Sequence, residues 1–387
     1  MTAVPAREHI YLSSVLWDGL WIIQQPICNE IQKQEPVLFV ERVASLFTVL
    51  RYPRLWRRLF AWLRGARRVS PNLRVLAPLP LLHLGHRFPG LFRLEFALQR
   101  RWILFWARRR LRGARERVLW LDHPLFECAI GTMGESLAVY HVGDEVAEFH
   151  TSHRPTLTAL EDRALRKADV VFAAADELAR ARDSRNRNTV AIQNAIDTSA
   201  FEATAPAAAF ADIDGIPSPR VAFIGVLDRW VDVELLESTV RALPQVAFVI
   251  IGPVRVAVAG LRRLANVHFL GTRHRSLVPG LLRRCSATLV PFLASGLTAR
   301  IVPAKVFEGL AAGTVPVCTA FSRNLEPFER QGLVLVARSP AEYAEHVRRA
   351  IREDSEQRRA ELAAYGLRQT WAQRWKQMRE VLERVPA

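Results

Sequence analysis

Residues 297–319 read LTARIVPAKVFEGLAAGTVPVCT, and the rest of the chain can be interpreted around this stretch. Pro303 suits the first turn of a helix, where its missing N–H is not needed, and Gly313 stands where a helix typically ends. The apolar residues between them recur at helical spacing: Val306, Phe307, Leu310 and Ala311. Residues 315–318 (VPVC) are typical of a short buried strand. The stretch therefore predicts one helix–strand unit of an α/β fold.

Lys305 and Glu308 are three residues apart, so they share one face near the start of this helix. The free N–H groups and the dipole of a helix N-terminus favour an anion, and a lysine there adds positive charge. A carboxylate one turn further on can accept hydrogen bonds from sugar hydroxyls. Together the two side chains suit a nucleoside diphosphate. The alternative is an ordinary α/β crossover whose Lys and Glu lie on the surface.

The pattern Pro-x-Lys-x-x-Glu-x-Leu-Ala-x-Gly-x-x-Pro-Val over residues 303–317 resembles the donor site of GT-B glycosyltransferases, close to family 4. This resemblance implies two Rossmann-like, doubly wound α/β domains that face a cleft, with a final helix crossing back to the N-terminal domain. It also implies a nucleoside diphosphate sugar as co-substrate and no required metal or other cofactor. Lys305 would bind the diphosphate and Glu308 the ribose.

The composition is that of a globular protein, with 50% apolar and 24% charged residues in 387. This length predicts two or three domains. The four cysteines, Cys28, Cys128, Cys285 and Cys318, have neither zinc-site nor disulfide-framework spacing, which fits a reducing cytoplasm. No signal pattern and no run of about 18 apolar residues occurs, so we expect no membrane crossing.

The N-terminal half opens as a Rossmann-like sheet would, with a strand at 9–14, a helix to about residue 33 and a strand at 36–41. The intervening loop contains Trp17, Asp18 and Gly19. It is similar to the opening loop of GT-B enzymes that build bacterial surface polysaccharides, teichuronic acid among them. The resemblance implies that these three residues lie near the acceptor.

Residues 51–117 carry much of the net charge of +16, with 18 arginines against two acids, Glu95 and Glu116. The apolar spacing predicts basic amphipathic helices over 51–68 and 91–112, a pattern that suits an anionic membrane surface. The candidate docking residues are Arg54, Trp56, Arg57, Arg58, Trp62, Trp102 and Trp106. Two alternatives are packing of the apolar faces on the core and nucleic-acid binding, but no nucleic-acid motif accompanies the charge.

Two later strands, 118–122 and 136–140, end in polar residues that include His123 and His141. Ligands of open α/β sheets lie at the carboxyl ends of strands, so both histidines are candidates for lining the cleft or for structural roles. Tyr-x-x-x-Asp, ending at Asp144, resembles a segment of inverting enzymes such as the xanthan glucuronosyltransferase, where the aspartate is the catalytic base. Asp144 is thus the candidate base, and a helix cap is the alternative.

Four regions are predicted: an acceptor domain over 1–205, a linker over 206–219, a donor domain over 220–366, and a returning helix over 367–387. The linker segment is rich in Ala, Pro and Asp and lacks periodicity.

The resemblance adds further donor-site candidates: Gly225, Asp228, Thr272, Arg273 and Arg300. Arg300 stands where family 4 enzymes often have a glutamate, which suits an inverting relative.

The function expected from the resemblance is sugar transfer to a lipid-linked or cell-surface glycan. We expect a cytoplasmic protein, peripheral on the inner membrane face, with no nucleic-acid partner. One alternative is a soluble glycosyltransferase acting on a protein or small metabolite. The other is an inactive glycosyltransferase-like subunit that binds membranes.

Overall fold

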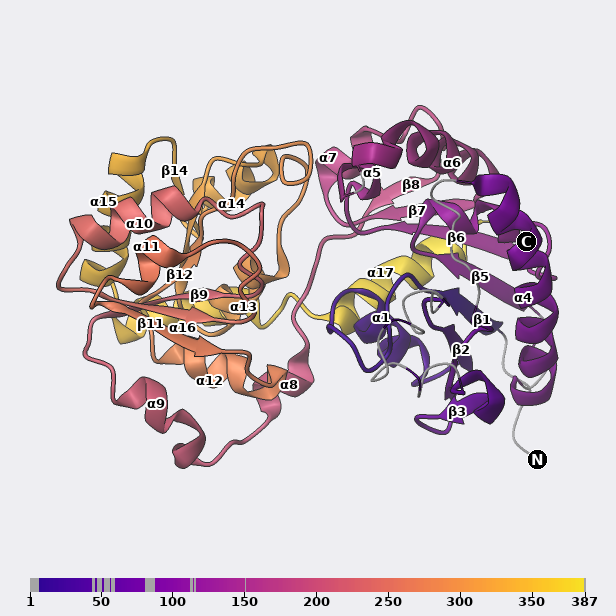
Figure 1. Cartoon of the computed structure of the whole chain (residues 1–387), viewed down its shortest axis with the longest axis horizontal. Coiled ribbons are helices and arrows are strands. Elements are labelled where there is room, and N and C mark those ends of the chain that lie inside the picture. The colour runs from indigo at the N-terminus through magenta and orange to yellow at the C-terminus, as the bar shows by residue number, and fades with distance from the viewer. Residues whose placement is uncertain are drawn as a thin grey trace. The chain divides into compact units, whose positions relative to one another are not determined.

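A computed structural model describes residues 7–43, 46, 51, 56, 60–80, 88–111, 114, 116–149 and 151–385. The chain divides into two compact units. The first comprises Met1–Ile192 with Trp375–Ala387, and the second comprises Gln193–Arg374. Each unit is built on its own sheet with helices on both faces (Figure 1).

The first unit contains an eight-stranded sheet with the order β3-β4-β2-β1-β5-β6-β7-β8. Its strands are β1 (Arg7–Leu12), β2 (Val37–Val40), β3 (Ala66–Arg68), β4 (Leu73–Leu76), β5 (Glu116–Leu121), β6 (Leu137–Val142), β7 (Val170–Ala173) and β8 (Thr189–Ala191). All neighbouring pairs are parallel except β3 with β4. Runs such as VLFV in β2 are buried throughout, as expected for a parallel sheet covered on both faces.

The longest helix described in the first unit is α4 (Pro89–Arg110). The unit also contains α1 (Gln24–Ile31), α5 (Val146–Phe149), α6 (Arg154–Lys167) and α7 (Asp176–Arg180). Among the described residues of this unit, the 3-10 helix η2 (Trp62–Arg64) precedes β3, η3 (Pro124–Ala129) follows β5, and η4 (Thr151–His153) follows α5.

The second unit contains a six-stranded parallel sheet with the order β11-β10-β9-β12-β13-β14. Its strands are β9 (Arg220–Ile224), β10 (Ala247–Ile251), β11 (Val267–Gly271), β12 (Ala287–Val290), β13 (Val315–Thr319) and β14 (Leu335–Ala337). This is the 3-2-1-4-5-6 order of a doubly wound sheet, whose direction of winding reverses between β9 and β12. The predicted α/β, doubly wound class is confirmed in both units.

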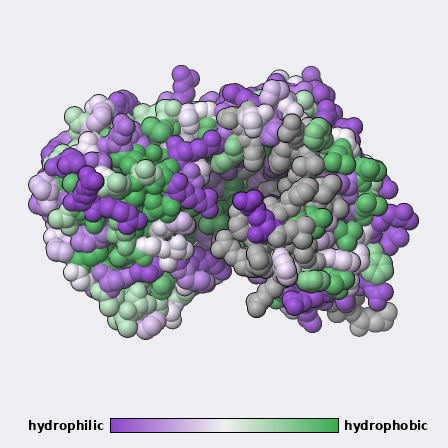
Figure 2. Space-filling view, in the orientation of Figure 1, coloured by the Kyte–Doolittle hydropathy of each residue, from purple (hydrophilic) through white to green (hydrophobic). Residues whose placement is uncertain are grey.

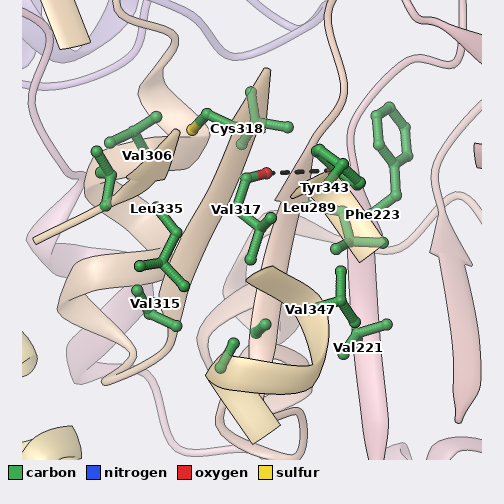
Figure 3. Close-up of a cluster of buried hydrophobic side chains, with 14 of the residues drawn as sticks. Val221, Phe223, Leu289, Val306, Val315, Val317, Cys318, Leu335, Tyr343 and Val347 are labelled. Atoms are coloured by element: carbon green, nitrogen blue, oxygen red, sulfur yellow. Dashed lines mark hydrogen bonds between the residues drawn. The ribbon is translucent and has the colours of Figure 1, made fainter. Parts of the chain in front are cut away.

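The core of the second unit lies on both faces of this sheet. Successive residues of β9 alternate between two buried clusters, with Val221 and Phe223 in one and Ala222 and Ile224 in the other. The covering helices include α10 (Val233–Ala242), α12 (Val278–Arg283), α13 (Ala304–Ala311), α15 (Pro340–Arg352) and α16 (Glu356–Gly366). Figure 3 shows the larger cluster, where the Tyr343 hydroxyl donates a 3.2 Å hydrogen bond to the Val317 carbonyl.

The last helix, α17 (Trp371–Leu382), joins the first unit from Trp375 onward. The Trp375 ring lies edge-on to His9, with ring centroids 5.9 Å apart. Leu382 is fully buried, and its carbonyl accepts a 3.3 Å hydrogen bond from the Arg7 guanidinium. These apolar and polar contacts explain why the final helix packs on the first sheet.

The predicted linker over 206–219 is not an open connection. It contains the 3-10 helix η5 (Ala207–Phe210) and helix α9 (Ala211–Asp214), both within the second unit. Phe210, Ile213 and Ile216 are buried against the second sheet. Their spacing of three residues is a helical signal that the Ala- and Pro-rich composition obscured.

The predicted basic helix over 51–68 is wrong at its C-terminal end, where the chain forms η2 and then strand β3. Gly65 breaks the helix with a φ of 66°, and a side chain there would overlap the ring of Trp106 in α4. Close packing on α4 thus overrides the local helical pattern. Residues 52–55 and 57–59 lie outside the described residues. The other predicted basic helix, at 91–112, is confirmed as α4.

A buried ion network joins three elements of the first unit. Arg182, 3% exposed, donates through Nη2 to Glu145 at 2.9 Å and to Glu161 of α6 at 2.8 Å. The Tyr140 hydroxyl of β6 also donates to Glu161, at 3.3 Å. One guanidinium therefore connects the loop after β6, helix α6 and the turn after α7.

We predict that Arg182→Met destabilises the first unit by about 3–5 kcal/mol, because Glu145 and Glu161 would stay buried without a counter-charge. Urea unfolding of the full chain measures this. The matched control is Arg185→Met, which removes an ion pair with Asp162 whose side chains are 48% and 32% exposed, and should cost about 0–1 kcal/mol. Equal losses in the two variants would contradict a special role for the buried network.

Candidate functional site

Lys305 of α13 lies at the winding reversal of the second sheet. Its Nζ is 4.3 Å from the ring centroid of Phe223 in β9 and 4.8 Å from that of Phe292, two residues beyond β12. Open α/β sheets bind ligands beyond the carboxyl ends of the strands at such a reversal. Two aromatic faces hold the ammonium group by cation–π attraction, so its position is defined before any ligand arrives.

Burial changes the proton affinity of both charged side chains on α13. It lowers the pKa of Lys305 to about 8, an effect that the nearby charge of Glu308 opposes. Burial also raises the pKa of Glu308, and Lys305 opposes that shift. At neutral pH Lys305 carries a positive charge that its protein surroundings only partly compensate. A bound anion would compensate the rest of this charge.

Glycines end the strands beside Lys305. Gly225 follows β9 with a φ of 118°, and Gly252 follows β10 with a φ of 132°. A Cβ on Gly225 would lie 3.1 Å from the Lys305 Nζ, and one on Gly252 would overlap the carbonyl oxygen of Gly225. The surface next to the ammonium is therefore bare backbone, which an oxygen-rich ligand can approach closely.

The other predicted donor residues of the second unit lie in varied surroundings. Asp228 accepts a 2.7 Å hydrogen bond from the N–H of Arg229. Thr272 and Arg300 are exposed, and Arg273 forms an ion pair with Asp212 of α9. The structure thus places Gly225 beside Lys305 and the charge of Glu308 within electrostatic reach of it, and shows Arg273 with an internal partner.

Asn194 supports the donor helix and was not among the predicted site residues. Its side-chain nitrogen donates a 2.9 Å hydrogen bond to the carbonyl of Val302, one residue before the N-cap Pro303. The side chain is buried, and its oxygen has no partner among the described residues. A pairing across 108 positions leaves no local signal in a single sequence.

The winding reversal of the first sheet lies between β1 and β5 and is closed by an aspartate. Asp122, directly after β5, accepts hydrogen bonds from the Ser13 hydroxyl at 2.9 Å and from the Ser14 N–H at 2.7 Å, both directly after β1. Burial raises the pKa of Asp122 to about 6. This clamp fixes the start of the loop that carries Trp17, Asp18 and Gly19.

Asp144, the candidate base, lies in the loop after β6. Burial raises its pKa to about 6, and the adjacent charge of Glu145 adds to the shift. Among the described residues, no side chain or N–H group bonds to its carboxylate, and the N–H of Val146 bonds instead to the Asp144 carbonyl at 3.0 Å. The carboxylate is a stronger base than an exposed aspartate. It does not make the helix-capping bond that was the alternative.

Two predicted acceptor residues are core residues. His141 is 2% exposed, its Nδ1 shares a 3.1 Å hydrogen bond with the Tyr11 hydroxyl, and burial lowers its pKa to about 4. Trp17 is 6% exposed and lies edge-on to Phe39 with ring centroids 5.1 Å apart. Buried packing rather than exposure to a ligand explains both, and periodicity alone does not separate the two situations.

The remaining acceptor candidates have other local roles. His123 accepts a 3.2 Å hydrogen bond from the N–H of Leu125 and so caps η3. Asp18 is exposed and forms a 2.7 Å ion pair with Arg67 of β3. Gly19 donates its N–H to the Leu16 carbonyl at 3.2 Å, which closes a turn.

Three of the predicted docking tryptophans pack against one another. The rings of Trp62 and Trp102 are 5.8 Å apart, and those of Trp102 and Trp106 are 5.7 Å apart, all measured between centroids. Trp56 is 50% exposed. Arg54, Arg57 and Arg58 lie outside the described residues.

Within the described parts of the chain, no group of three or more His, Cys, Asp or Glu residues is placed to hold a metal ion. Transfer without a metal stays a prediction. The helices described are all too short or too polar to cross a membrane.

Residues 229–380 match a protein-family model described as Glycosyl transferase-like. A curated protein of Bacillus subtilis strain 168, named as a teichuronic acid biosynthesis glycosyltransferase, TuaH, is 25% identical over 174 residues. That match covers 43% of this chain and 44% of the relative, so it spans under half the length of either protein.

Solved structures match nearly the whole chain at low identity. Sucrose-phosphate synthase from Thermosynechococcus elongatus superposes with a TM-score of 0.69 at 15% identity, covering 97% of this chain and 98% of that one. Anabaena HepE in complex with UDP and glucose gives a TM-score of 0.67 at 15% identity, covering 97% and 99%. A trehalose-6-phosphate structure from E. coli bound with UDP-2-fluoro glucose gives 0.68 at 12%, covering 98% and 99%. These likenesses show that the chain shares its fold with these proteins.

Proposed function

We propose that this protein transfers a sugar from a nucleoside diphosphate sugar to a lipid-linked or cell-surface glycan, with inversion at the anomeric carbon. The observation that carries the proposal is Lys305, held between Phe223 and Phe292 at the winding reversal of the second sheet. Its ammonium and the N–H groups at the start of α13 can bind a diphosphate together. Solved structures of the same fold are named as complexes with UDP or a UDP-sugar, so UDP is the first nucleotide to test.

In the proposed reaction the acceptor hydroxyl loses its proton to a carboxylate oxygen of Asp144. The acceptor oxygen then forms a bond to the anomeric carbon as the bond from that carbon to the phosphate oxygen breaks. Lys305 stabilises the negative charge that grows on the leaving diphosphate, so the proposal requires no metal. An aspartate with a pKa of about 6 is still mostly ionised at pH 7 and accepts a proton more readily than an ordinary one.

We propose the inner face of the cell membrane as the place of action. Helix α4 exposes Leu94, Leu98 and Phe105, which are 66%, 56% and 46% exposed. Arg101, Arg108 and Arg109 are exposed on the same helix. Apolar and basic side chains together suit the headgroup layer of an anionic membrane. The relative named for teichuronic acid biosynthesis supports a surface polysaccharide as the product.

Two alternatives remain open to experiment: a soluble enzyme that modifies a protein or small metabolite, and an inactive subunit. The lowered pKa of Lys305 and its bare-backbone surroundings favour a working donor site over an inactive one.

We predict that Lys305→Ala weakens UDP binding by about 1.5–3 kcal/mol, roughly 10- to 150-fold, because it removes a charged partner of the diphosphate. Isothermal titration calorimetry with UDP, GDP and TDP measures this. Lys305 carries its charge below its pKa, so wild-type affinity should fall as the pH rises above about 8, and the variant should lack that fall. Lys376→Ala, an exposed lysine of α17, is the control. Unchanged affinity in Lys305→Ala would refute the donor site.

We predict that Asp144→Asn keeps UDP affinity and lowers sugar transfer by about 100-fold or more, because a general base typically contributes that much. Transfer is measured as radiolabel from UDP-sugars entering the organic extract of bacterial membranes. Asp183→Asn, an exposed aspartate of the same unit, is the control. Full transfer activity in Asp144→Asn would mean that another group removes the proton.

A further inference from the structure

Arg68, Arg74 and Arg110 lie at one edge of the first sheet, and none of them has a carboxylate partner among the described residues. Arg68 and Arg74 lie directly opposite each other in the antiparallel β3–β4 pair, so their side chains share one face of the sheet. Arg110 is the last residue of α4. The pKa of Arg74 is lowered by burial and then by the charges of Arg68 and Arg110, so each of these two guanidinium groups lies within electrostatic reach of Arg74.

The sequence offers Arg68 and Arg74 no acid nearby, since no Asp or Glu occurs between Glu41 and Glu95. In the described structure Arg68 donates only a long 3.4 Å hydrogen bond to the Ser70 carbonyl, and Arg110 lies over the Trp106 ring at 5.1 Å. Arg74 has no hydrogen-bond or ion-pair partner among the described residues. Like charges opposite each other on an antiparallel pair destabilise a sheet, so an anion from outside the chain would relieve a standing repulsion.

The two elements that carry the arginines are held together by close packing. Gly65 lies directly against the Trp106 ring, where any side chain would overlap it, and so joins the start of β3 to α4. The same indole ring supports Arg110. The three cations are therefore presented by a packed unit, which lowers the ordering cost of binding a ligand.

Exposed apolar side chains occur close to the cluster in sequence, on α4 and just before β3. Phe60 and Leu63, just before β3, are 56% and 59% exposed, and Phe105 of α4 is 46% exposed. On the side of the first unit where α4 lies, hydrophobic and hydrophilic residues are interspersed on the surface (Figure 2). A free phosphate ion gains nothing from apolar neighbours, whereas a phospholipid places its phosphate beside its acyl chains.

We infer that Arg68, Arg74 and Arg110 form a binding site for the phosphate group of an anionic membrane lipid, with Phe60, Leu63 and Phe105 entering the acyl boundary beside it. The inference rests on the membrane association proposed above and names the lipid group that the surface recognises. It also separates these three arginines from neighbours such as Arg67, which is paired with Asp18.

The experiment compares two variants of the full chain with equal loss of charge. The site variant is Arg68→Gln/Arg74→Gln/Arg110→Gln. The control is Arg263→Gln/Arg323→Gln/Arg368→Gln, three exposed arginines of the second unit. Flotation with phosphatidylcholine vesicles, with and without phosphatidylglycerol, gives the partition coefficient at physiological ionic strength. We expect the site variant to bind anionic vesicles roughly tenfold or more weakly than the control variant.

Thermal unfolding supplies a second measurement that does not require vesicles. Without lipid, the site variant should unfold at the same or a higher temperature than wild type, because the repulsion has been removed. Inorganic phosphate should raise the unfolding temperature of wild type more than chloride at equal ionic strength, and this difference should vanish in the site variant. A large drop in its unfolding temperature would show that the arginines have a structural role and overturn the inference.

The outcomes separate the inference from the function on which it rests. If wild type binds anionic vesicles and both variants bind equally well, the phosphate site is refuted while membrane association stands. If wild type does not bind, membrane association fails and the inference with it. If phosphate raises the unfolding temperature of wild type but the site variant binds vesicles normally, the site binds a soluble anion and the lipid inference is overturned. If the site variant binds vesicles as well as the control variant does but binds duplex DNA more weakly, the ligand is nucleic acid and the lipid inference is overturned.

Discussion

The contact of one ammonium group with two aromatic rings organises the second unit. Phe223 and Phe292 belong to β9 and to the chain just after β12, the two neighbours between which the sheet reverses its winding. Lys305 reaches both because α13 starts beyond these strand ends. Burial there lowers its pKa to about 8, which leaves a cation partly stripped of water and without a full counter-charge. Such a group interacts strongly with a diphosphate, because much of its desolvation has already occurred on folding.

The two sheets share a winding order, but different kinds of residue lie at the point where each sheet reverses its winding. In the first sheet Asp122 fills the position after β5 and binds Ser13 and Ser14 after β1. In the second, glycines at the strand ends leave backbone exposed beside Lys305. In the first sheet a carboxylate occupies the reversal and orders the loop that follows. In the second sheet the reversal carries a positively charged side chain beside glycine backbone. This difference favours the second unit as the place of the proposed nucleotide site, on physical grounds that do not depend on the comparisons.

Local patterns predicted those features that depend on neighbours in sequence. The α13 helix, the parallel strands and α4 follow from apolar spacing, and Lys305 and Glu308 follow from a helix start with two charges on one face. The missed features depend on distant partners. His141 is a core residue that shares a hydrogen bond with the hydroxyl of Tyr11, 130 positions away. Strand β3 replaces the end of a helix because Gly65 packs on Trp106.

The excess positive charge of the chain arises where arginines occur without acidic residues near them in sequence. In the second unit many surface arginines have a carboxylate three or four positions away, as in Arg241 with Glu237 and Arg349 with Glu353. Helical spacing makes such pairs easy to provide. The chain between Glu41 and Glu95 provides none, although it contains arginines that face one another across β3 and β4. Because such repulsion weakens the folded state, its presence in a region that also carries exposed apolar side chains argues that these cations serve a partner outside the chain.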